Sequence, residues 1–384
     1  MRVGIGAHVV TASERLAVNG VLDAGQLSPG SRVKEFEGLF ARRVGGRYGV
    51  MVNSGTDALR VALGAMKEVY GWEDGSRVLL PALTFVATMN VVLQNDLDPV
   101  LVDIDEFTYG IDLRTMFEGS NRSARCVIPV HLFGHAVRMT RGGYPDPLMV
   151  QARAAGIRVL EDSCECLGVT KVCGDIACYS TYVCHMISTG VGGMAITNRK
   201  GLEGVMRSLA NHGRSLSHIP GHTKGNDIRK RFVFDRIGYS SRATEFEAAI
   251  GLEQLKGLAE NIKRRRAIAA RLLGGLDSYG GDLRLPWGFE ESGWMMFPIV
   301  VHKWSRVDKW RLCEFLEKAG IETREMLPLI NQPCYKKFRI NPKAYPNADH
   351  VNRNGFYIGC HPGMTDDDVD FVVETFRRFD FSRD

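Results

Sequence analysis

The two stretches that predict the fold are Val159-Leu160-Glu161-Asp162 and Gly174-Asp175-Ile176-Ala177-Cys178-Tyr179-Ser180-Thr181-Tyr182-Val183-Cys184-His185. The first is a short apolar run closed by two carboxylates, a pattern typical of a buried parallel strand with an exposed functional end. The second runs from a strand-like segment into one short loop, and a glycine-rich turn and an apolar strand at residues 194–197 follow it. In sheets of this kind, ligands bind where the strands end.

Asp162 would lie at the carboxyl end of its strand. A carboxylate there can pair with a protonated heterocyclic nitrogen, as in pyridoxal phosphate (PLP) chemistry. Taken alone, the residue is more often explained as the cap of a following helix.

A second motif lies upstream, where an apolar strand near residues 50–52 passes through a small polar turn into a helical pattern. A helix beginning at Gly55 and Thr56 offers free backbone amides and the positive end of its dipole to a phosphate group. The alternative is an ordinary capped helix with no ligand.

Together these segments resemble the DegT family of PLP-dependent sugar aminotransferases and dehydratases, which have the aspartate aminotransferase fold (fold type I). The likeness covers most of the chain and includes the motifs at residues 54–56, 81–88, 102–105, 129–134, 161–162 and 238–255. It implies an α/β chain with a large, mostly parallel sheet domain at residues 1–255 and a smaller C-terminal α/β domain at residues 256–384.

The resemblance also implies the roles of individual residues. Gly55, Thr56 and Ser180 would hold the cofactor phosphate, Phe85 would stack on the pyridine ring, and Asp162 would pair with its nitrogen.

Three other positions of the cofactor site differ from the aminotransferases of the family. Glu165 stands where they commonly have Gln and where the dehydratases tend to have an acid. Ser240 replaces an Asn that reaches the cofactor phosphate of the neighbouring subunit in a homodimer, the assembly that the resemblance implies. Val191 replaces a Glu.

The family's Schiff-base lysine falls on His185. An imidazole cannot link covalently to PLP, so PLP or pyridoxamine phosphate (PMP) would be held noncovalently, and the ring can still move protons near neutral pH. Lys171, the one lysine between Asp162 and Lys200, lies in a stretch that is typical of a hairpin or a surface loop.

A histidine-containing subset of the family, typified by GDP-4-keto-6-deoxymannose 3-dehydratase, carries the same replacement. The resemblance therefore implies a nucleotide-sugar 3-dehydratase of deoxysugar and lipopolysaccharide biosynthesis, with L-glutamate as amino donor and a nucleotide-linked keto sugar as substrate. Two alternatives remain, namely a sugar aminotransferase that works without its lysine and a noncatalytic binder of the same fold.

Cysteines and histidines raise the question of a metal. A related dehydratase type uses an iron–sulfur cluster, but here the Cys-x-Cys at residues 164–166 directly follows Asp162, and the loop at 211–218 has no cysteine. Buried thiols are the simpler explanation of the nine cysteines. His212, His218 and His222 fit solvent-facing or substrate contacts, so no metal site is predicted.

Composition limits the other function classes. The chain has 384 residues and a net charge of +5, with no apolar run near 18 residues and no leader-like start. We expect a cytoplasmic protein that binds neither membrane nor nucleic acid, with the basic run at 263–266 as a solvated helix face. The run at 229–231 is a candidate to bind a diphosphate or is a solvated loop.

The remaining pattern predicts the order of elements. Strand and helix signals alternate from residue 48 to about 197, and a long helix is predicted over residues 244–273. A second unit is predicted to begin near Leu283, with a strand at 297–301 and helices at 311–319 and 366–379.

Overall fold

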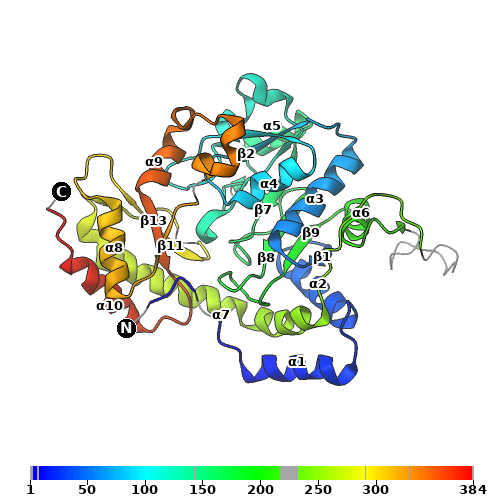
Figure 1. Ribbon diagram of the computed structural model, residues 1–384, viewed down its shortest axis with the longest axis horizontal. Coiled ribbons are helices and arrows are strands. Elements are labelled where there is room, and N and C mark those ends of the chain that lie inside the picture. The colour runs from blue at the N-terminus through cyan, green and yellow to red at the C-terminus, as the bar shows by residue number, and fades with distance from the viewer. Residues whose placement is uncertain are drawn as a thin grey trace.

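The structure is a computed structural model that describes residues 3–6, 8–141, 144–216, 232–289, 291–327 and 329–382 (Figure 1). The run at 229–231, His218 and His222, discussed above, lie outside these residues.

A seven-stranded sheet forms the centre of the large unit. Its strand order is β1-β9-β8-β7-β4-β2-β3. The strands are β1 (Tyr48–Val52), β2 (Arg77–Pro81), β3 (Asp98–Val102), β4 (Cys126–Val127), β7 (Arg158–Asp162), β8 (Ile176–Ser180) and β9 (Gly193–Thr197). The pairs β2–β3, β2–β4, β4–β7 and β7–β8 are parallel, whereas β9 is antiparallel to both β8 and β1. The predicted mostly parallel sheet is confirmed.

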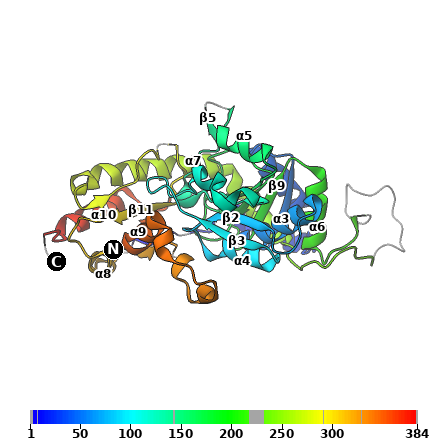
Figure 2. The same ribbon diagram turned by 90° about the horizontal axis from the view of Figure 1, so that it is seen from above.

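Both faces of this sheet are buried, as the continuous apolar strands predict. Leu80 and Leu160 point into one core, while their neighbours Leu79 and Val159 point into a second core on the other face. Figure 2 shows helices on both sides, with α5 opposite α4. The covering helices are α2 (Ser31–Arg43), α3 (Gly55–Tyr70), α4 (Val86–Gln94), α5 (Pro147–Ala154) and α6 (Lys200–Ala210). Helix α1 (Ala12–Ala24) packs instead against the long helix at residues 245–276.

The C-terminal unit has its own antiparallel sheet, in the order β10-β11-β13-β12. Its strands are β10 (Leu283–Arg284), β11 (Met296–Val301), β12 (Thr323–Glu325) and β13 (Gly355–Gly359), and its helices are α8 (Lys309–Ala319), α9 (Pro346–Asn354) and α10 (Asp366–Arg378). The predicted strand and both predicted helices are therefore present, with ends that differ by one or two residues.

Helix α7 (Glu245–Leu276) connects the two units. It begins with a capping box in which Thr244 and Glu247 satisfy each other's backbone amides. Figure 1 shows it running from α1 and α2 at one end to α10 at the other, and it contacts all three helices. The predicted boundary between residues 255 and 256 falls inside this helix.

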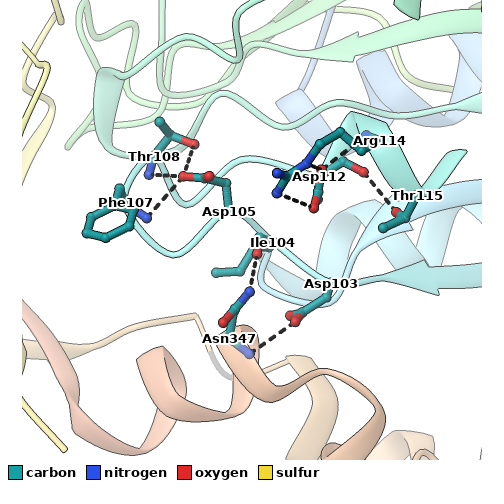
Figure 3. Close-up of polar contacts among 9 residues, drawn as sticks. All are labelled: Asp103, Ile104, Asp105, Phe107, Thr108, Asp112, Arg114, Thr115 and Asn347. Carbon is teal, nitrogen blue, oxygen red and sulfur yellow. Dashed lines mark hydrogen bonds and ion pairs between the residues drawn. The ribbon is translucent and has the colours of Figure 1, made fainter.

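The segment after β3 makes a further connection. Asp103 accepts hydrogen bonds from the backbone amides of Asn347 (3.0 Å) and Ala348 (2.9 Å), so it caps the N-terminus of α9 from the other unit. The side chain of Asn347 donates back to the carbonyl of Ile104 (2.9 Å; Figure 3). The 102–105 motif therefore ties the large sheet to the C-terminal unit.

Short elements complete the fold. They are the strands β5 (Thr140–Arg141) and β6 (Tyr144–Pro145) and the 3-10 helices η1 (Leu113–Phe117), η2 (Gly119–Ser123), η3 (Leu132–Gly134), η6 (Asp277–Tyr279), η7 (Leu329–Asn331), η8 (Pro333–Phe338) and η9 (Pro342–Ala344). Within the described part of the chain, no helix is both long and apolar enough to cross a membrane.

Candidate active site

The strands β1, β7 and β8 end at the same edge of the large sheet, and the predicted phosphate residues meet there. A Cβ atom on Gly55 would lie only 2.8 Å from Ser180 Cβ and 2.9 Å from Cys164 Sγ. Glycine is therefore required at position 55 so that the start of α3 can lie directly against the end of β8.

The start of α3 has the features of an anion site. Ser54 Oγ accepts the amide of Asp57 (3.1 Å) and caps the helix. The amides of Gly55 and Thr56 stand in the first turn, where a helix offers no internal acceptor, and the helix dipole makes this end positive. Beside them, Ser180 Oγ accepts the amide of Tyr182 (3.3 Å), which leaves its hydroxyl proton for an anion.

Asp162 is buried at the end of β7. One carboxylate oxygen accepts Thr88 Oγ1 (2.9 Å) and the other accepts the amide of Cys164 (3.3 Å). Burial is the largest effect on this group and raises its pKa, although these hydrogen bonds oppose the shift. A protonated ring nitrogen is the kind of cation that would reverse the shift and keep Asp162 ionised. This chemistry fits PLP or PMP.

Helix α4 brings two further side chains to the same edge. Phe85 is its N-cap residue and has an exposed ring, and Thr88 lies within the first turn of the helix. The hydroxyl of Thr88 forms two hydrogen bonds, one with the hydroxyl of Thr84 (2.9 Å between the oxygens) and one that it donates to Asp162. One turn of chain thus fixes both the predicted stacking residue and a partner of the predicted nitrogen ligand.

Glu165 lies one turn beyond Asp162, and its Oε2 accepts the amide of Phe133 (2.6 Å). Burial, with a smaller effect from the negative charge of Asp162, raises the pKa of Glu165 to about 7, against the hydrogen bond from Phe133. Glu165 can therefore exchange a proton near neutral pH.

His185 follows β8 in the loop where it was expected. Its amide donates to the carbonyl of Tyr182 (2.9 Å), and its ring Nδ1 lies 3.8 Å from Cys184 Sγ. Burial, with a smaller effect from the cationic Arg265, lowers the pKa of His185 to about 4, against an opposing hydrogen bond to the backbone of Tyr182. The ring is therefore neutral at pH 7 and able to accept a proton.

His185 borders a cavity of about 580 Å³. The titratable or charged side chains around this cavity come from the N-terminal segment, α1, the His185 loop, α7 and the segment after β13, and they are His8, Glu14, Cys184, Glu253, Glu260, Arg264, Arg265 and His361. Within the described chain, no hydrogen bond connects the His185 ring with Asp162 or Ser180.

Ser240 lies in a segment that runs beside the end of β1, because its neighbour Ser241 accepts the amide of Asn53 (2.9 Å) and Arg242 pairs with Val52. Ser240 is exposed, and its hydroxyl accepts Arg242 Nη2 (3.2 Å). Lys171 is also exposed, and its side chain lies against Gly45, so it does not reach the cofactor residues.

The sequence reasoning missed several contributors. The sequence does not single out Thr88 and Cys164 as partners of Asp162, although Thr88 lies in the motif at residues 81–88 and Cys164 in the Cys-x-Cys that follows Asp162. The prediction that the basic run at 263–266 is a solvated face is wrong for Arg265, which is only 3% exposed and donates to the carbonyl of His185. Four consecutive cations around a helix cannot all face water, because each residue turns by about 100°.

The nine cysteines are all free. Among the described residues, no group of three or more His, Cys, Asp and Glu side chains is placed to hold a metal ion. Burial raises the pKa of Cys126, Cys164, Cys166 and Cys178, as expected for small thiols packed beside a sheet.

Comparisons with known proteins give the context of this site. The chain is 29% identical to the GDP-4-keto-6-deoxy-D-mannose 3-dehydratase of Escherichia coli O55:H7, over 95% of this chain and 96% of the relative. It is also 29% identical to the GDP-perosamine synthase of Caulobacter vibrioides, over 97% and 96%.

A solved E. coli GDP-4-keto-6-deoxy-D-mannose-3-dehydratase, with bound hydrated PLP, superposes with a TM-score of 0.87 at 27% identity, covering 98% of this chain and 99% of the other. This agreement confirms the predicted aminotransferase-like fold of type I. Residues 9–377 match the model of one family. The chain belongs to the DegT/DnrJ/EryC1/StrS aminotransferase family.

Proposed function

We propose that this chain is a PLP/PMP-dependent nucleotide-sugar 3-dehydratase that removes the C3 hydroxyl of a 4-keto-6-deoxy sugar, with L-glutamate as amino donor. The observation that carries the proposal is the histidine at position 185, in the loop where the resembled family has its lysine, and burial keeps the pKa of this ring low. The relatives named 3-dehydratase support the assignment.

Each residue of the site has a task in this proposal. Gly55, Thr56 and Ser180 bind the cofactor phosphate, and Phe85 covers one face of the ring. Asp162 holds a proton on the ring nitrogen, so that the bound cofactor supplies an electron sink and, as PMP, an amine that condenses with the keto group.

His185 is the proton-transfer base at the cofactor C4′ carbon, because it is neutral and cannot attach covalently. Glu165 faces the cofactor as a second group that exchanges a proton near pH 7. With no lysine to bind the cofactor again, water releases the donor nitrogen. The overall change is then glutamate and the 4-keto-6-deoxy sugar going to 2-oxoglutarate, ammonia and the 3-deoxy sugar.

A second candidate is a sugar aminotransferase that works without lysine. It is favoured by the perosamine synthases, which are as similar to this chain as the dehydratases are. The two candidates differ in the fate of nitrogen, since an aminotransferase leaves it on the sugar. A noncatalytic binder, the third candidate, would bind cofactor or sugar without turnover.

A homodimer completes the proposal. Several large apolar side chains are exposed in the single chain, namely Phe85, Tyr182, Val191, Phe232 and Ile237. A second copy of the chain would cover exposed apolar side chains of this kind. Light scattering on the purified protein should give twice the chain mass of 42.6 kDa. We place the enzyme in the cytoplasm, because nine free cysteines suit a reducing compartment.

The test is to incubate the protein with PLP, L-glutamate and a panel of nucleotide-linked 4-keto-6-deoxy sugars, and to measure ammonia and product mass. Ammonia in equal amount to a product that has lost the C3 hydroxyl supports the dehydratase. An amino sugar without ammonia supports the second candidate, and binding without product supports the third.

A further inference from the structure

Arg265 is a buried cation whose recorded partners are all neutral oxygens. On α7, its Nε donates to Asn261 Oδ1 (2.7 Å), and Nη1 donates to the carbonyls of Trp294 (3.2 Å), Met295 (2.9 Å) and Cys360 (2.6 Å). Burial lowers its pKa to about 10. Burying a charge without a counter-ion is costly, and hydrogen bonds must offset that cost. Such an arrangement calls for a reason beyond packing.

The same two side chains hold the loop that carries His185. Arg265 Nη2 donates to the carbonyl of His185 (3.4 Å), and Asn261 Nδ2 donates to the carbonyl of Met186 (2.7 Å). Asn261 and Arg265 are four residues apart and so lie on one face of the helix. Two consecutive peptide units of the loop are therefore fixed by one face of α7.

Arg265 also joins this loop to the C-terminal unit. Trp294 and Met295 lead into β11, and Cys360 follows β13. The loop position is thus defined relative to the large sheet, α7 and the small sheet together.

We propose that Asn261 and Arg265 are positioning residues, which we call the α7 clamp, and that the clamp fixes the main chain at His185 and Met186 so that the imidazole is presented in one orientation. The catalytic consequence rests on the proposed function, whereas the fixing of the loop does not.

The charge of Arg265 supports this assignment. Besides burial itself, the positive charge of Arg265 favours the neutral form of His185. A carboxylate partner for Arg265 would cancel this positive field, and the use of carbonyl acceptors instead preserves it. The other charged groups near His185 are those given above for its cavity.

Arg266 provides a matched control. It is the next residue of α7, is exposed, and donates to the carbonyls of Ser292 (2.9 Å) and Glu291 (2.5 Å). It therefore also joins α7 to the segment before β11, but its recorded bonds do not include the His185 loop.

The test compares Arg265→Gln, Arg265→Lys, Asn261→Leu and Arg266→Gln with the unaltered protein, all without added sugar. Hydrogen exchange of residues 181–190 reports the loop, because the amides of His185 and Thr189 are bonded within it. We expect exchange about tenfold faster in Arg265→Gln and Asn261→Leu, the factor that corresponds to ~1.4 kcal/mol or roughly one hydrogen bond. Arg266→Gln should leave this segment unchanged.

A second readout is the titration of the His185 ring, followed by NMR of histidine-labelled protein and assigned by the signal missing from His185→Asn. Arg265→Gln should raise the midpoint, and Arg265→Lys, which keeps the charge, should restore most of the original value. These two readouts need no turnover, so a failure of the proposed function would not affect them.

Where turnover is found, the clamp predicts a fall in kcat with little change in KM for the sugar. Loop exchange and His185 titration that are the same in Arg265→Gln and Asn261→Leu as in the unaltered protein would overturn the proposal. If Arg265→Gln fails to fold, Asn261→Leu, which retains the buried arginine, decides the same question.

Discussion

Replacing Gly55 with alanine should damage cofactor binding through a contact that involves no charge. The added Cβ would stand 2.8 Å from Ser180 Cβ and 2.9 Å from Cys164 Sγ. Carbon atoms in contact lie about 3.5–4.0 Å apart, so the start of α3 and the end of β8 must separate by about 0.7 Å or more.

The expected size follows from that displacement. Overpacking of this kind typically costs about 1–3 kcal/mol of folding stability. A shift of about 0.7 Å also takes a phosphate hydrogen bond of about 2.9 Å beyond its useful range. A hydrogen bond to a charged group contributes about 1.5–3 kcal/mol, so the loss of one should weaken PLP binding by about 10- to 150-fold.

Titration with PLP, followed by quenching of protein fluorescence, measures the affinity, and urea denaturation measures the stability. Gly274→Ala is the matched control, because position 274 of α7 is exposed and a Cβ atom there would have no neighbour within 4 Å. Helix propensity predicts that this control is slightly stabilised. If Gly55→Ala bound PLP as tightly as the unaltered protein and was equally stable, the result would contradict the inference that α3 and Ser180 are too close to accommodate a Cβ atom at position 55.

Three further predictions concern the titratable residues of the site. His185→Asn should keep PLP binding but stop turnover. Because the pKa of His185 is about 4 in the folded protein, only the unfolded chain binds a proton at this residue between pH 6.5 and 4, so the free energy of unfolding of the unaltered protein falls by up to about 3 kcal/mol over that range. The variant should lack this fall, and denaturation measured across the same pH range tests the difference. His185→Lys should attach PLP covalently, and intact mass after borohydride reduction should show the adduct; a mass equal to the chain alone would mean that position 185 does not face the cofactor. Glu165→Gln keeps an oxygen that accepts the Phe133 amide but removes a carboxyl group whose pKa is about 7 in the folded protein. The variant should therefore be more stable than the unaltered protein above pH 7, and the difference should vanish below about pH 4.5. Equal stability at pH 8 would contradict the raised pKa.

The convergence of Gly55, Asp162 and Ser180 could be predicted because parallel strands place their carboxyl ends together. The three residues are far apart in sequence, yet Asp162 and Ser180 end β7 and β8, and Gly55 lies three residues after the end of β1 in the same sheet. Apolar runs and strand-end polar residues are local patterns, and the order of strands then brings them to one edge.

Other features depend on contacts that no local pattern encodes. The burial of Arg265 follows from carbonyls at Trp294, Met295 and Cys360, which reach it only after both units are folded. In the same way, Val3 pairs with Ile321, so that the first described residues lie against the C-terminal unit. From sequence alone, a run of charged residues predicts a solvent-exposed helix face, because its tertiary partners are not encoded in the local pattern.

The measurement that tests the central claim most directly is to follow isotopically labelled nitrogen from L-glutamate through a single incubation with PLP and a nucleotide-linked 4-keto-6-deoxy sugar. The account predicts that the label is recovered as ammonia, in equal amount to a sugar that has lost its C3 hydroxyl and carries no label. Recovery of the label in an amino sugar, with the C3 hydroxyl retained, would contradict it.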